Sequence, residues 1–346
     1  MPLFHTSLFS IDPPGDAFVS RGAAWSFEKE SGVYRGPAKK MHEHADKLRQ
    51  QQGHAPTGNY FSEEVPVFFD MEVMIRAPGV AQARRALNLL VSSMAVQEGS
   101  ITFCPEPFGI EPREAGTAAR TTSFRSMAGL LDVCRLANRA SKVRNFTYAV
   151  HKLALSYRSS SPHVMDLDPG ESPRLFRVQA DPIYHVYLAN AITLAYSAIE
   201  EVGLQIRANK DNPSKMPDGT WNPIVKTNLE ERLRKSRIDI SDDQLWTLRG
   251  PKTRIEKKRA PPSTGKPRWS RGSVRDVNMR LIDALALASW LRSCAAAHRF
   301  DEKARSLTVY DAHNVQSLAR RLIMERLGFW MPRPKPPRKK SGGGSP

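Results

Sequence analysis

The most regular pattern in this sequence is a set of apolar residues between Val274 and His298. They recur every three or four positions, which places them along one side of an α-helix. The set consists of Val277, Leu281, Leu285, Ala288, Leu291 and Ala295. We therefore expect one long amphipathic helix over residues 274–298, packed in a helical bundle.

Further helices are expected in the C-terminal half, where the same period recurs. They cover residues 182–202, residues 223–235, a segment capped by Ser241 with Trp246 as its core anchor, and a closing stretch from Thr308 to Gly328. The spacing of Thr308 and Asp311 is that of a capping box. These elements predict a mainly helical C-terminal half.

The N-terminal half contains segments with the helical spacing and segments with the two-residue alternation of a strand. Residues 65–77 alternate apolar and polar side chains as a strand does, and residues 80–98 carry a helical stripe that Gly99 ends. A second short strand at 100–103 and helices over 122–144 and 146–157 follow. The fold class expected for the chain is α+β, mainly α.

The chain is expected to form more than one domain, because 346 residues exceed the usual size of one core. Changes in composition and stretches rich in Pro and Ser indicate the boundaries. A polar stretch rich in Ser, Pro and Asp follows residue 158 and marks the boundary. The expected parts are an irregular arm at 1–60, an α+β domain at 61–158, a linker at 159–180, a helical bundle at 181–330 and a disordered basic tail at 331–346.

The net charge of +17, from 52 Lys and Arg against 35 Asp and Glu, indicates an anionic partner. RNA or another nucleic acid is the first candidate, ahead of an anionic membrane surface. The three cysteines, Cys104, Cys134 and Cys294, lack metal or disulfide spacing, so we expect a reduced, cytoplasmic compartment and no metal. No secretory signal and no membrane span are visible in the sequence.

The charge is most concentrated between Arg249 and Arg271, where nine Lys and Arg residues accompany a single acid, Glu256. Prolines and glycines exclude a regular element there, and the Trp269 ring is able to stack on a base. We interpret residues 249–272 as a mobile basic loop that grips a phosphate backbone; a solvated linker is the alternative. The candidate nucleic-acid ligands are Arg254, Lys257, Lys258, Arg259, Lys266, Arg268, Trp269 and Arg299.

Arg292 and His298 form an Arg-x5-His pattern late in the helix with the apolar stripe, after the segment Asp283-Ala284-Leu285. In this pattern, and in the helix containing residues 195–201 that precedes it, the chain resembles the HEPN superfamily. The resemblance covers residues 181–330. The ribonuclease members of that superfamily are helical bundles that carry Arg-x4-6-His late in a long helix.

The resemblance implies a metal-independent endoribonuclease that needs no cofactor, and a toxin or antiviral effector is one role of that kind. His298 would act as the acid and base in cleavage, and Arg292 would stabilise the phosphate. A homodimer is implied as well, because two motifs commonly face one cleft in this superfamily. The N-terminal domain would then meet a regulatory partner.

The residues themselves leave alternatives open. His298 lies seven positions after Leu291 and so continues the apolar stripe, which is also the pattern of a buried structural histidine. On an unbroken helix Arg292 and His298 would point about 120° apart. The alternative function is a non-enzymatic nucleic-acid-binding or assembly protein that uses the bundle as a dimer surface, and a weaker one is a protein adaptor.

Overall fold

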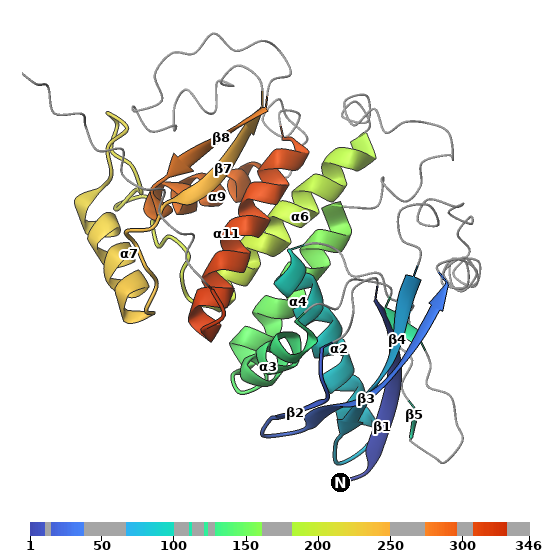
Figure 1. Ribbon diagram of the computed structural model, residues 1–346. Coiled ribbons are helices and arrows are strands. Elements are labelled where there is room, and N and C mark those ends of the chain that lie inside the picture. The colour runs from blue at the N-terminus through green and yellow to red at the C-terminus, as the bar shows by residue number, and fades with distance from the viewer. Residues whose placement is uncertain are drawn as a thin grey trace, which may run out of the picture.

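The computed structural model describes residues 1–10, 15–37, 67–99, 111–112, 121–123, 129–160, 182–249, 274–295 and 307–330. A curved sheet from the N-terminal part of the chain lies beside a group of helices, and a two-stranded ribbon lies at the far end of those helices (Figure 1). The fold is α+β and mainly helical, which confirms the expected class.

The sheet is built largely from residues for which we expected an irregular arm, so this prediction is wrong. Its strands are β1 (Leu3–Ser10), β2 (Phe18–Arg21), β3 (Ser26–Pro37), β4 (Val67–Arg76), β5 (Glu111–Pro112) and β6 (Thr121–Ser123). They follow the order β2-β3-β4-β1-β5, and β6 also pairs with β1. The central strand β4, expected at residues 65–77, pairs antiparallel with both β1 and β3. These partners lie far away in the sequence, and their pairing stabilises segments whose own apolar pattern is weak.

Helix α2 (Val80–Glu98) has the bounds expected from its stripe, and it ends at Gly99, whose φ of 72° is left-handed. Met71, Val73 and Ile75 of β4 are buried, as its period predicts, and they join the same core as α2. The short strand expected at 100–103 lies outside the described residues.

The remaining helices pack beside α2. They are α3 (Leu130–Ala140), α4 (Arg144–Ser160), α6 (Pro182–Glu201), α7 (Pro223–Lys235), α9 (Leu281–Ala295) and α11 (Val309–Leu327). The helix expected over 122–144 is shorter than predicted, because Thr121–Ser123 pair with β1 and the helix begins only after Gly129, whose φ is 79°. The helices expected at 182–202 and 223–235 and the capping box of Thr308 with Asp311 are confirmed.

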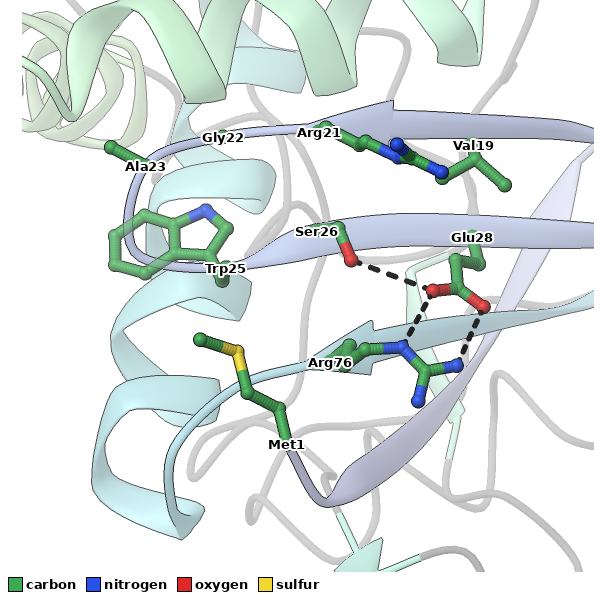
Figure 2. A pocket seen from close by; sticks show the side chains of 9 residues that line it. All are labelled: Met1, Val19, Arg21, Gly22, Ala23, Trp25, Ser26, Glu28 and Arg76. Carbon is green, nitrogen blue, oxygen red and sulfur yellow. Dashed lines mark hydrogen bonds and ion pairs between the residues drawn. The ribbon is translucent and has the colours of Figure 1, made fainter.

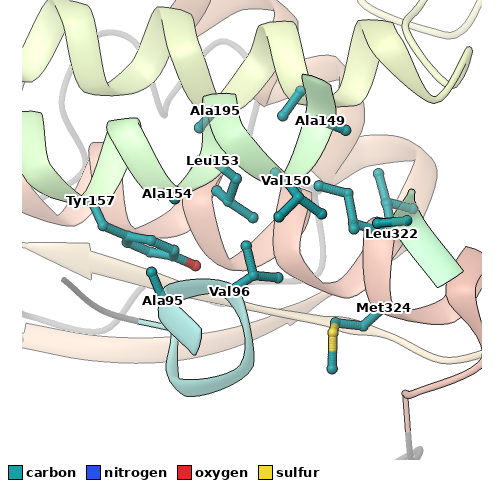
Figure 3. Close-up of a cluster of buried hydrophobic side chains, with 14 of the residues drawn as sticks. Ala95, Val96, Ala149, Val150, Leu153, Ala154, Tyr157, Ala195, Leu322 and Met324 are labelled. Atoms are coloured by element: carbon teal, nitrogen blue, oxygen red, sulfur yellow. The ribbon is translucent and has the colours of Figure 1, made fainter. Parts of the chain in front are cut away.

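One cluster of buried side chains runs through the described helices. Figure 3 shows where α2, α4, α6 and α11 contribute to it, through residues such as Val96, Val150, Ala195 and Leu322. Helices α4 and α6 pack side by side although the expected linker separates them in sequence. Most of that linker, and the expected tail, lie outside the described residues. No helix in the described ranges is long and apolar enough to span a membrane.

The ribbon corrects two helix predictions. Residues that follow Ser241 form strand β7 (Gln244–Arg249), and the first residues of the expected helix 274–298 form strand β8 (Val274–Met279). In β7, Gln244, Trp246 and Leu248 are buried at alternate positions, and Trp246 is the expected core residue at 1% exposure. Val277 and Met279 lie two apart on β8, so they also fit the period of a strand.

Candidate nucleic-acid interface

Of the residues expected to contact RNA, Arg292 is the one that lies in the described part of the chain. It is exposed on the last turn of α9, next to the buried Leu291. The others lie outside the described residues: His298, Arg254, Lys257, Lys258, Arg259, Lys266, Arg268, Trp269 and Arg299. The pairing of Arg292 with His298 therefore stays a prediction.

The ribbon determines where the basic segment leaves the fold. The last residue of β7, Arg249, pairs with the first residue of β8, Val274. The two ends of the chain segment 250–273, with its eight Lys and Arg residues and one Glu, therefore meet at one point. Its charge is tethered to the end of the ribbon, which packs through β7 against α11.

Tyr196 connects the elements around Arg292. Its side chain is 3% exposed on α6, its hydroxyl accepts a hydrogen bond from the Ile206 amide at 3.4 Å, and it forms another with Ser289 of α9. Burial is the main cause that raises the pKa of Tyr196 above its ordinary value. The phenol therefore stays neutral at physiological pH and keeps its proton for hydrogen bonding.

Two arginines interact electrostatically with Tyr196, and a third interacts with one of these two. Arg292 of α9 and Arg232 of α7 are close enough to Tyr196 to interact with it electrostatically, and Arg207, which follows α6, interacts in the same way with Arg232. We call Tyr196, Arg207, Arg232 and Arg292 the arginine cluster. Glu200 is the acid that acts on Tyr196 here, and it raises the pKa of the phenol.

Arg232 is held in place by the backbone. One terminal nitrogen donates to the Gly203 carbonyl at 3.0 Å, and Nε donates to the Asn228 carbonyl at 3.3 Å. Burial, followed by repulsion from Arg207, lowers the pKa of Arg232, although a guanidinium stays charged at neutral pH. Within the described residues, no carboxylate forms an ion pair with Arg207, Arg232 or Arg292.

This arrangement is suited to binding an anion. Two positive charges that repel each other gain most from a negative group placed between them. Guanidinium groups bind phosphate with paired, charge-assisted hydrogen bonds. Sequence reasoning did not identify Arg207 or Arg232, because only the folded chain brings Arg232 near Tyr196 and Arg207 near Arg232.

Apart from the arginine cluster, a polar hollow lies at the end of the large sheet (Figure 2), with a volume of about 510 Å³. Arg76 from β4 binds Glu28 from β3 with two hydrogen bonds of 2.9 and 3.3 Å, and this contact lowers the pKa of Glu28. Arg21 and the ring of Trp25 line the same hollow. Because Glu28 already compensates a positive charge here, the arginine cluster is the stronger candidate for an anion.

The described residues contain no group of three His, Cys, Asp or Glu side chains placed to hold a metal ion. Comparison with known proteins found no family model, no curated protein and no solved structure that matches this chain.

Proposed function

We propose that this protein binds RNA and cleaves it without a metal ion, as a HEPN-like ribonuclease. The observation that carries the proposal is the exposed Arg292, which interacts electrostatically with the Tyr196 phenol, as Arg232 does. Arg207 interacts with Arg232, and none of the three guanidinium groups forms an ion pair with a carboxylate among the described residues. The net charge of +17 and the tethered basic segment support an RNA partner.

The chemistry follows from these residue types. The ribose 2′-hydroxyl gives up its proton and attacks the adjacent phosphorus, the 5′-oxygen leaves with a proton, and a 2′,3′-cyclic phosphate results. Arg292 would neutralise the charge that develops on the phosphate, and His298 would transfer the protons near neutral pH. A single histidine is few for two proton transfers, so the proposal includes a homodimer in which two motifs share one RNA.

The proposal is tested by incubating purified protein with total RNA in the presence of a chelator and mapping the ends of the products. We expect cyclic phosphate ends, and we expect His298→Ala to abolish cleavage with RNA affinity retained. Arg292→Met should lower both cleavage and affinity, whereas the matched control Arg84→Met removes an exposed arginine of α2 and should change neither. Undiminished cleavage by His298→Ala protein would exclude the proposed mechanism.

The second candidate function is a nucleic-acid-binding protein without catalysis. It is favoured by the composition of the arginine cluster itself, in which the only hydroxyl that could titrate, Tyr196, has a raised pKa and is unsuited to proton transfer at neutral pH. Salt-dependent RNA binding by the wild-type protein, with no change in the RNA ends, would establish this function instead of cleavage.

A further inference from the structure

A small hollow lies next to the arginine cluster and shares Arg207 with it. Its volume is about 260 Å³, and its other walls come from the turn at Asn209–Asn212 and from Ile224 and Asn228 on the first turns of α7. The carbonyl of Asn228 accepts a hydrogen bond from Arg232, so one wall of the hollow is joined directly to the cluster.

Both walls are fixed by local hydrogen bonds. The side chain of Asn222 caps α7 by accepting from the Ile224 amide at 3.0 Å. On the opposite wall, the side-chain oxygen of Asn209 accepts from the Asn212 amide at 2.7 Å, and the Asn209 amide donates to the Asn212 carbonyl at 3.0 Å. The hollow therefore exists before a ligand arrives.

The chemistry of the walls matches a flat ligand with polar edges. Asn212 and Asn228 are exposed, and within the described residues no hydrogen bond engages their side-chain amides. Ile224 is 60% exposed, which is high for a large apolar residue and provides a surface for one ring face. The volume lies below the range typical of drug-sized ligands and suits a single ring system.

We propose that this hollow is a base subsite, which holds one nucleobase of an RNA strand whose neighbouring phosphate lies on the arginine cluster. The inference rests on the proposed RNA binding and adds base selection to it. An asparagine amide presents a donor and an acceptor side by side, which is the pattern that pairs with N6 and N7 of adenine. Adenine is therefore the base that the subsite favours.

The test uses full-length His298→Ala protein, so that RNA stays intact, and fluorescent single-stranded oligoadenylate and oligouridylate of equal length. We expect the Kd for oligoadenylate to be lower by between about 5-fold and 150-fold. Asn228→Leu and Asn212→Ala should remove this preference while the Kd for oligouridylate stays within about twofold. The matched control Asn190→Ala, at an exposed position of α6, should keep the preference.

The outcomes separate the subsite from the proposed function. Equal affinities for both oligonucleotides in the parent protein, or a preference that survives both asparagine substitutions, would overturn the base subsite and leave RNA binding intact. Failure to bind either oligonucleotide would overturn RNA binding itself, and the subsite with it. Because Asn212 and Asn228 are exposed, loss of folding is not expected, and a thermal unfolding scan of each variant verifies this.

Discussion

Arg232 and Arg321 carry the same charge, but their surroundings give them different roles. Arg321 is 1% exposed, and its guanidinium binds Glu325 at 2.7 Å and the carbonyls of Asp239, Asp242 and Asp243. Arg232 has backbone partners but faces another arginine. Composition counts both residues equally, and only tertiary contacts distinguish an arginine that is paired with a carboxylate from one that lies near another arginine.

A single glycine tests the packing at the end of the large sheet. A Cβ on Gly22 would lie 2.5 Å from Oδ1 of Asn138 and 2.9 Å from the Trp25 carbonyl, since Asn138 of α3 binds the β2 backbone at Ser20. We expect Gly22→Ala to lower the free energy of unfolding by about 1–3 kcal/mol, measured by urea titration. The control Gly15→Ala, where no atom lies within 4 Å of the added Cβ, should have little effect. Equal effects of the two changes would contradict this packing.

At the scale of elements, the sequence predicts those segments whose own signals suffice. The stripes of helices α2 and α11, together with Gly99, Gly328 and the capping box, locate both helices. Strands β1 to β3 were not predicted, because they are stabilised by pairing within the sheet that β4 organises and their own alternation of apolar and polar residues is weak. Strand β8 resembles a helix in sequence because its few apolar residues fit both periods.

Arg321 fastens α11 to the segment that leads into β7, so its removal should be costly. Arg321→Met would remove the guanidinium that pairs with Glu325, whose side chain is 8% exposed, and that binds several carbonyls. Glu325 would keep the hydrogen bond that it accepts from the Asp239 amide. We expect a loss of about 3–5 kcal/mol in the free energy of unfolding, measured by denaturant titration. The control Arg234→Met removes an exposed ion pair of 3.7 Å with Glu230 and should cost less than about 1 kcal/mol. A small loss at Arg321 would show that this buried hydrogen-bond network contributes little.

At the scale of the molecule, the described structure combines a continuous core with positive charge at two kinds of place. The arginine cluster is held on the helices, whereas the basic segment is tethered at the end of the ribbon. The overall charge, the basic segment and Arg292 can be identified from the sequence alone. Arg207, Arg232 and Tyr196 come from different elements, and no short-range spacing in the sequence indicates that they meet.

The tether predicts that the basic segment is separable from the fold. Since Arg249 pairs with Val274, replacing residues 250–273 with Asn-Gly should close the ribbon as a two-residue hairpin. We expect the thermal unfolding midpoint to be retained and the slope of log affinity for RNA against log salt to become shallower, by about 0.7 for each phosphate that the segment neutralises in the full-length protein. An unchanged slope would show that the basic segment does not bind RNA.

The same shortened protein provides the most direct test of the arginine cluster. With the basic segment removed, we expect Arg207→Met with Arg292→Met to weaken binding of single-stranded RNA at least tenfold and to reduce the salt slope further. The paired control Arg84→Met with Arg85→Met removes the same charge from exposed positions of α2 and should have a much smaller effect. Equal losses of affinity from the two pairs would mean that RNA responds only to overall charge, and the arginine cluster would not be its binding site.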